Sequence, residues 1–264
     1  YNLGLMYDMG KGVKQDHREA VKWYRLAAAQ GNAGAQLNLG SMYYQRKGVT
    51  QDYREAAKWF RLAATQGNAP AQYNLGLMYD LGKGVTQDYR EAVKWFRLAA
   101  DQGNAGAQLK LGLGYVIGQG VTQDYREAMK WFRMAAAQGN ASAQSYLGAA
   151  YASGEGVIQD YREAVKWFRL AADQGNPGAQ YSLGSMFDQG KGVTQDHREA
   201  VKWYRLAAEQ EYADAQFNLG LMYSQGQGVK QDHRDAAKWY RLAAAQGHTV
   251  AQFNLALMYD LGQG

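Results

Sequence analysis

The chain has 264 residues and contains no cysteine. Disulfide bonds, cysteine-ligated zinc and a thiol nucleophile are therefore excluded. Proline is almost absent as well, with two residues against 32 glycines, a balance that favours helices separated by glycine turns. No apolar run approaches the ~18 residues that a membrane-spanning helix needs, so we expect no membrane insertion.

Histidine is also scarce, and the four histidines do not indicate a metal site. His17, His197 and His233 take the same place in different copies of a repeat that is described below. Stacked helices lie ~10 Å apart, whereas zinc ligands must all lie ~2.0–2.3 Å from one ion. His248 stands where other copies have an asparagine that caps a helix. We expect neither a metal nor a cofactor, and no Ser-His-Asp grouping indicates an enzyme.

The net charge of +5 is mostly a property of the repeat, because 21 of the 29 basic residues belong to it. They occupy three positions, Arg18, Lys22 and Arg25, which return every 36 residues in seven copies. Acidic residues such as Asp16 and Glu19 stand beside them. The pattern predicts a solvated helix face, and we expect no nucleic-acid partner.

The tryptophans reveal the repeat directly, since all seven lie 36 residues apart. Their positions are Trp23, Trp59, Trp95, Trp131, Trp167, Trp203 and Trp239. A fixed period of roughly 20–50 residues indicates a solenoid, in which copies of one supersecondary unit stack along the chain. Positions that recur in every copy are expected to form the scaffold, and positions that vary are where function is to be sought.

The copy at residues 68–103 predicts a pair of helices. Asn68 is a typical N-cap for the first helix, here called helix A, which we expect to end where Gly82 can adopt the left-handed conformation. Asp88 and Glu91 form a capping-box pattern at the start of the second helix, helix B. Glu91 is also placed to pair with a lysine three residues further on.

A glycine recurs inside helix A, although glycine there costs ~1 kcal/mol relative to alanine. Gly76 is one example, and the others are Gly4, Gly40, Gly112, Gly148, Gly184 and Gly220. We expect this glycine to let a bulky aromatic side chain of a neighbouring helix B approach the backbone. Ala256 replaces it in the last, incomplete copy, which has no following helix B in this sequence.

The recurring residues resemble the Sel1-like repeat, a relative of the tetratricopeptide repeat. In residues 68–103 they are Ala71, Leu75, Gly76, Met78, Tyr79, Gly82, Gly84, Val85, Asp88, Ala92, Trp95, Phe96, Ala99, Ala100, Gln102 and Gly103. The resemblance covers essentially the whole chain. It implies an all-α fold, a right-handed α-solenoid superhelix of 36-residue helix–turn–helix repeats.

The same resemblance implies a protein–protein interaction scaffold in which helix A lines a concave surface and helix B a convex one. It further implies a periplasmic or secreted bacterial protein, with the cytoplasm as the alternative. A cysteine-rich bacterial branch of the family has been linked to penicillin binding. This chain lacks that branch's cysteines, so the activity is not carried over.

The period predicts one solenoid domain, residues 1–264. A partial repeat at 1–31 precedes full repeats at 32–67, 68–103, 104–139, 140–175, 176–211 and 212–247, and a half repeat with helix A alone occupies 248–264. Neither end carries a polar capping repeat, which solenoids need for solubility. We therefore expect either flanking repeats beyond this sequence or end-to-end contacts between chains.

Helix A varies more than helix B, and two of its positions indicate where a partner would bind. An asparagine series can donate to and accept from a peptide backbone, a use known from tetratricopeptide proteins: Asn2, Asn38, Asn74, Asn218 and Asn254. The alternative is a solvated polar position. The preceding position carries an apolar row that predicts either packing between repeats or a groove for a partner segment, and it includes Tyr73, Leu109, Tyr181, Phe217 and Phe253.

The middle of the chain breaks the pattern. Lys110 and Tyr146 interrupt the asparagine series. Small residues replace larger ones nearby, namely Gly114, Ala149, Ala150, Ala152 and Ser153. We expect a local depression that serves as a partner pocket, flanked by Lys110 and Tyr146.

These observations predict a non-enzymatic scaffold that holds a protein or peptide in a groove lined by helix A. An engineered or recently expanded array without a selected ligand is one alternative, because residues 85–104 and 157–176 differ only where Thr86 becomes Ile158. A cell-envelope enzyme of the cysteine-rich type is another, and the absence of cysteine disfavours it.

Overall fold

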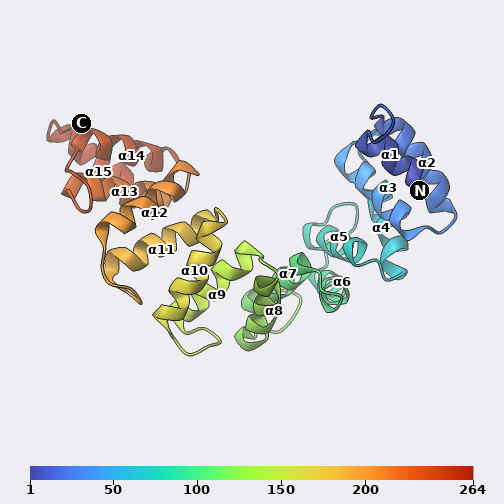
Figure 1. Cartoon of the computed structure of the whole chain (residues 1–264), viewed down its shortest axis with the longest axis horizontal. Helices are drawn as coiled ribbons and strands as arrows, with labels where there is room; N and C mark the ends of the chain where they lie inside the picture. The colour runs from blue at the N-terminus through green and yellow to red at the C-terminus, as the bar shows by residue number, and fades with distance from the viewer. Residues whose placement is uncertain (264) are drawn as a thin grey trace. The chain divides into compact units, whose positions relative to one another are not determined.

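The computed structural model describes residues 1–263, which form fifteen α-helices joined by short loops (Figure 1). The odd-numbered helices are the predicted helices A: α1 (Asn2–Met9), α3 (Ala33–Gln45), α5 (Ala69–Leu81), α7 (Ala105–Ile117), α9 (Ala141–Ser153), α11 (Pro177–Gln189), α13 (Ala213–Gln225) and α15 (Thr249–Asp260). The even-numbered helices are the predicted helices B: α2 (His17–Ala29), α4 (Tyr53–Thr65), α6 (Tyr89–Asp101), α8 (Tyr125–Ala137), α10 (Tyr161–Asp173), α12 (His197–Glu209) and α14 (His233–Ala245).

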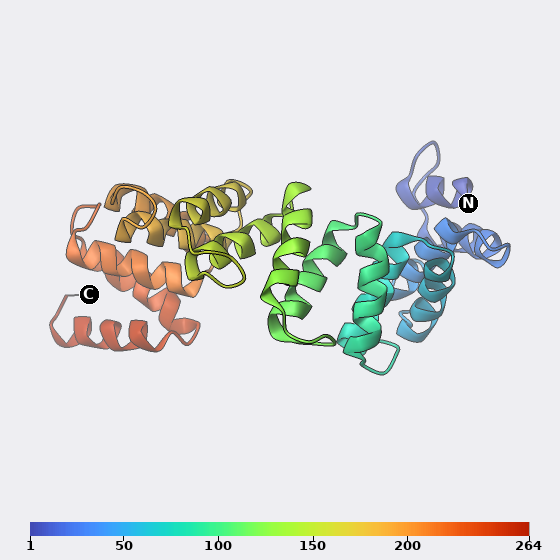
Figure 2. The ribbon, with the colours of Figure 1, turned by 90° about the horizontal axis from the view of Figure 1, so that it is seen from below.

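The chain divides into two compact units, Tyr1–Ala135 and Ala136–Gly264, with the boundary inside α8. Within each unit, helices that are neighbours in the sequence pack side by side (Figures 1 and 2). Contacts between sequence neighbours are typical of repeat proteins. Within residues 1–263, no helix combines the length and the apolarity that a membrane span requires.

Both predicted helix starts are present in the copy at residues 68–103. The Asn68 side chain accepts a hydrogen bond from the Ala71 backbone N–H at 3.0 Å. The Asp88 carboxylate accepts from the Arg90 and Glu91 N–H groups at 2.9 and 3.1 Å. Two of the donors that a helix start leaves unpaired are thus satisfied at α6.

The reciprocal half of the predicted capping box is absent from this copy. The backbone N–H of Asp88 donates instead to the carbonyl of Tyr79, at 3.1 Å. This bond ties the loop to the end of α5 and occupies the donor that Glu91 would have used. Glu91 therefore pairs with Lys94, as its spacing predicts.

The glycine inside helix A has the steric role that the sequence predicts. A Cβ atom added to Gly76 would lie 2.6 Å from the Phe96 ring of α6, closer than real Cβ contacts allow. The equivalent glycines meet the equivalent rings in the same way: Tyr24, Phe60, Phe132, Phe168, Tyr204 and Tyr240. Helix B therefore packs on the bare backbone of the preceding helix A.

The tryptophans join each helix pair to the one before it. Trp59 packs against the core formed by α2 and α3, and Trp95 against the core formed by α4 and α5. Trp131 in turn belongs to the core of α6 and α7. These contacts place the invariant tryptophans in the scaffold.

Buried glutamines, which the sequence analysis did not single out, continue the same connection. Gln72 donates to the carbonyl of Ala64 near the end of α4, at 3.1 Å. Its own oxygen accepts from Gln102 at the end of α6, at 2.7 Å. Gln72 thus adds a second donor to the Ala64 carbonyl, which also accepts from the Gly67 N–H at 3.0 Å, and both polar atoms of its own carboxamide are paired.

Candidate partner-binding site

Part of the repeated basic charge of helix B is paired within the same helix. Lys58 pairs with Glu55 at 3.3 Å, and five further lysines form the same i, i+3 ion pair. Arg61 of α4 donates to the Tyr79 hydroxyl of α5 at 2.5 Å.

Three asparagines of the helix A series interact with tyrosine hydroxyls of the preceding helix B. Asn38 interacts with Tyr24, and the other two pairs are Asn218 with Tyr204 and Asn254 with Tyr240. Burial raises the pKa of each of these tyrosines above its usual range. These asparagines therefore serve packing between repeats.

Asn74 is the exception, because the preceding helix B carries Phe60 in place of tyrosine. Over the described residues, its carboxamide makes no hydrogen bond. It lines a hollow of about 130 Å³ together with Ser41, Tyr44 and Leu77. We call this space the α5 hollow. Its polar group is available to a ligand in a way that Asn38 is not.

Three rings of the apolar row pack against helix B of the same helix pair. The ring centroid of Tyr73 lies 5.9 Å from that of Phe96 on α6. Tyr181 and Phe217 make equivalent contacts at 5.8 Å, with Tyr204 and Tyr240. Aromatic pairs at this separation stabilise a core, so the packing interpretation accounts for these three rings.

Two members of the row also contact the start of the next helix A. Tyr181 lies 5.3 Å from Tyr212, and Phe217 stacks on His248 at 4.6 Å. The His248 ring accepts the Ala251 backbone N–H at 3.1 Å, which makes it the substituted cap that the sequence predicts.

Lys110 takes part in an ion pair between helices A. Its Nζ lies 3.0 Å from Oδ2 of Asp80 on α5. In the first copy the Tyr24 hydroxyl donates to Asp8 at 3.3 Å and also interacts with Asn38. Here the ring is Phe96, and the longer lysine reaches the acid directly. The side chain of Asp80 is only 18% exposed, so the pair is partly shielded from water.

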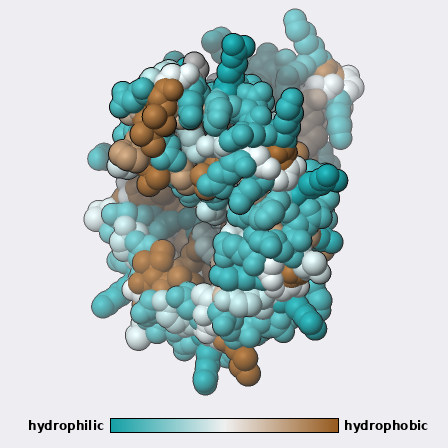
Figure 3. Space-filling model, turned by 90° about the vertical axis from the view of Figure 1, so that its left-hand side faces the viewer, coloured by the Kyte–Doolittle hydropathy of each residue, from teal (hydrophilic) through white to brown (hydrophobic). Residues whose placement is uncertain are grey.

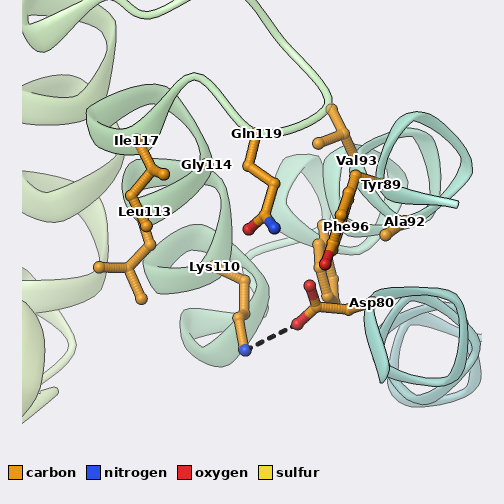
Figure 4. Close-up of a pocket in the computed structure, with 10 residues that line it drawn as sticks. All are labelled: Asp80, Tyr89, Ala92, Val93, Phe96, Lys110, Leu113, Gly114, Ile117 and Gln119. Carbon is orange, nitrogen blue, oxygen red and sulfur yellow. Dashed lines mark hydrogen bonds and ion pairs between the residues drawn. The ribbon is translucent and has the colours of Figure 1, made fainter. Parts of the chain in front are cut away.

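A depression lies beside Lys110, and Gly114 is part of its lining. We call this space the α7 hollow; it measures about 110 Å³ and is bounded by Asp80, Tyr89, Phe96, Lys110, Gly114 and Gln119 (Figure 4). All of these residues belong to the first unit. Tyr146, the other predicted flank, lies in the second unit on α9 and is 42% exposed.

Sequence reasoning missed two features of these surfaces. The first is the set of polar residues in the α7 hollow: Asp80, Tyr89 and Gln119. The sequence carries two signals for them. Gln119 stands where several other copies have a loop lysine, and Asp80 lacks the histidine that accompanies Asp8 and Asp188. Helix B also exposes an apolar row, read in the sequence only as scaffold: Leu26, Leu62, Leu98, Met134, Leu170, Leu206 and Leu242.

No group of three or more metal-ligating side chains comes together in the part of the chain that the structure describes. His17 and His197 instead pair with Asp8 and Asp188, at 3.0 and 2.9 Å. The histidines thus tie the start of helix B to the end of the preceding helix A.

Repeated helix pairs, each closed by the same glycine–ring contact and joined to its neighbours by the same tryptophan and glutamine contacts, define an α-solenoid repeat protein. The family model of the Sel1 repeat matches residues 1–32, 33–68, 69–104, 105–140, 141–176, 177–212, 213–248 and 249–264. The chain therefore belongs to the Sel1 repeat family. Proteins of this family generally mediate protein–protein interaction.

Two solved structures of bacterial proteins are similar to the chain. A protective antigen of uropathogenic Escherichia coli with an SLR fold is 41% identical, with a TM-score of 0.90; the match covers 99% of this chain and 56% of that protein. A Sel1 repeat protein from Oxalobacter formigenes is 39% identical, with a TM-score of 0.81, covering 97% of this chain and 74% of that one. The chain thus spans little more than half of the E. coli protein. No curated protein sequence matches it.

Proposed function

We propose that this chain is a non-enzymatic scaffold that binds an extended protein or peptide segment along helices α3, α5 and α7. The observation that carries the proposal is a pair of neighbouring hollows, of about 130 and 110 Å³, at helix A positions where the copies differ. Both lie in the first unit and are offset by one repeat. The helix B residues between them are almost unchanged from copy to copy.

The hollows are offset by one repeat, so an extended segment that follows the helices A would cross both. A polyproline-type segment rises ~3.1 Å per residue with three residues per turn. Side chains three residues apart therefore point to the same side and are ~9 Å apart. One segment would place such side chains in the α5 and α7 hollows, with a peptide group beside the Asn74 carboxamide.

Peptides selected from a displayed random library for binding to the chain would test the proposal. We expect Asn74→Ala to weaken their binding about 3- to 10-fold, the effect of one lost hydrogen bond. Asn218→Ala should leave affinity unchanged and lower thermal stability instead, because Asn218 interacts with Tyr204. Leu98→Ala, on exposed helix B surface, is the matched control and should also leave affinity unchanged.

Two results would contradict the proposal. Selected peptides that lose affinity with Leu98→Ala but not with Asn74→Ala would move the binding surface to helix B. Repeated failure to select any peptide would favour the expanded array without a ligand.

A further inference from the structure

The α7 hollow is one copy of a junction that other copies fill with their own side chains. In the first copy the junction consists of Asp8, His17, Tyr24, Asn38, Met42 and Lys47. In the α7 copy the same places hold Asp80, Tyr89, Phe96, Lys110, Gly114 and Gln119. Only the aspartate is retained, so this junction has lost several groups that occupy the others.

The first group lost is an apolar side chain. Met42 and Met78 are buried, at 3% and 1% exposure, and Gly114 puts no side chain in their place. A Cβ atom added to Gly114 would meet only ordinary contacts, the nearest being 3.4 Å from the Gln119 carbonyl and 3.9 Å from Val93. The vacated space is the hollow of about 110 Å³, smaller than the ~150 Å³ cavity that admits benzene. It suits one unbranched aliphatic chain.

The second loss is a cation over a tyrosine ring. Lys83 lies 5.5 Å from the ring of Tyr53, and Lys191 lies 5.6 Å from that of Tyr161. The equivalent pair in the α7 copy is Gln119 and Tyr89, so no loop lysine covers this ring. Figure 4 shows the Gln119 side chain reaching into the space between α6 and α7.

The third loss is a partner for the aspartate. Asp8 and Asp188 each receive a histidine nitrogen on Oδ1, at 3.0 and 2.9 Å. Asp80 has Tyr89 at the histidine place, and Lys110 binds its Oδ2. Oδ1 of Asp80 makes no hydrogen bond in the described part of the chain.

We propose that the α7 hollow is a receptor for a lysine side chain of the bound partner. The aliphatic stem would occupy the space above Gly114, and the ammonium would meet Asp80 Oδ1, the Tyr89 hydroxyl and the Gln119 amide oxygen. An ammonium has three donors and no acceptor, which matches these three oxygens. The occupant thus replaces the methionine stem and the loop cation that three other junctions, those of Lys47, Lys83 and Lys191, supply themselves.

Lys110 limits the strength of this site, because it already shares the Asp80 carboxylate at 3.0 Å. A second ammonium gains the attraction of Oδ1 but is repelled by Lys110. The junction therefore recognises a lysine without holding it tightly. Replacement of Lys110 by methionine should strengthen the binding of a lysine probe.

This inference rests on the proposed binding of a segment to helices A, and it can be tested on its own. The probe is N-acetyl-lysine N-methylamide, titrated into the isotope-labelled chain and followed by the amide signals of Gly114 and Gln119. For a ligand of this size we expect a dissociation constant of about 1 mM. The matched neutral probe is N-acetyl-norleucine N-methylamide, which has the stem without the ammonium.

Three substitutions separate recognition from folding. Asp80→Asn should weaken binding about tenfold, since it removes a charged acceptor. Gly114→Met and Gln119→Lys restore the residues of other copies, so they preserve the fold and should abolish binding by filling the hollow. Equal affinity for the norleucine probe, unchanged affinity in Gly114→Met and Gln119→Lys, or no saturable shift with the lysine probe would each overturn the proposal.

The two proposals fail separately. If lysine recognition is wrong, peptide binding that depends on Asn74 persists while the lysine probe causes no saturable shift. If the segment-binding proposal is wrong, Asn74→Ala does not change the affinity for the peptides, whether or not the lysine probe binds.

Discussion

A single glycine sets how closely two helices approach in every repeat. Gly76 has no Cβ atom, and the Phe96 ring takes that place on the α5 backbone. The sequence alone predicts this contact, because a glycine that costs helix stability recurs at one place and is always followed by an aromatic residue at a fixed distance. The sequence alone does not predict which asparagine side chain lacks a hydrogen-bond partner. That depends on the packing, which places Asn74 beside Phe60 but Asn38 beside the Tyr24 hydroxyl.

Substitution of Gly76 by alanine should destabilise the protein by about 1–3 kcal/mol, the usual cost of overpacking. The gain in helix propensity of ~1 kcal/mol only partly offsets the clash with Phe96. Gly178, in the first turn of α11, is a matched control, because a Cβ atom there meets nothing closer than 3.5 Å. Chemical denaturation should show loss of stability for Gly76→Ala and none for Gly178→Ala; equal effects would show that the ring contact is unimportant.

The buried tyrosines predict how stability depends on pH. Burial raises the pKa of Tyr204 above its usual value, so the folded protein keeps this proton at a pH where the unfolded chain, with a pKa of ~10, releases it. The unfolded state then binds fewer protons, and stability falls as pH rises above about 10. Denaturation midpoints at about pH 9 and about pH 11 should differ less in Tyr204→Phe than in the wild type. Parallel declines in the two proteins would contradict this.

The helices differ in how far their ends could be predicted. The N-caps at Asn68 and Asp88 and the left-handed Gly82, with φ of 65°, follow from residue type alone. The capping box fails because the end of α5 supplies a competing acceptor, the Tyr79 carbonyl, which a local pattern does not contain. The same limit applies to the α7 hollow, whose walls come from α5, α6 and α7 together.

The observed capping predicts different roles for two acids at the start of α10. Asp160 accepts from the Arg162 and Glu163 N–H groups at 2.8 and 3.1 Å, so Asp160→Ala should cost about 1 kcal/mol. Glu163 pairs with Lys166 in an exposed ion pair, and Glu163→Ala should change the free energy of unfolding by less than about 0.5 kcal/mol. Comparable losses of stability in the two variants would show that Glu163 also caps the helix, as the full capping box requires.

At the scale of the whole chain, the 36-residue repeat makes the fold predictable from the sequence. The interaction surfaces are harder to predict, because they lie at positions where the residue differs from copy to copy. One exposed surface is the last helix: α15 presents Val250, Phe253 and Leu257, with Phe253 67% exposed, and Leu261 follows at its C-cap. Figure 3, which views the C-terminal side of the molecule, shows apolar patches on a mostly hydrophilic face. Such exposed apolar side chains favour association with another surface.

We therefore expect the 264-residue chain to self-associate through α15. Sedimentation velocity over a range of concentrations should show reversible association. The variant Phe253→Glu should weaken it, because burial of a charge at the contact is unfavourable. Leu170→Glu, on the exposed surface of α10, is the matched control. A monomer at every concentration, or equal weakening by both variants, would exclude α15 as the contact.

We propose that helix A, and not helix B, contacts the partner. The most direct test is photo-crosslinking of a selected peptide to chains that carry p-benzoylphenylalanine in place of Leu77, beside the α5 hollow, or in place of Leu98, on the exposed surface of helix B. We expect a crosslink at Leu77 that unlabelled peptide competes away, and none at Leu98. A competed crosslink at Leu98 with none at Leu77 would contradict it.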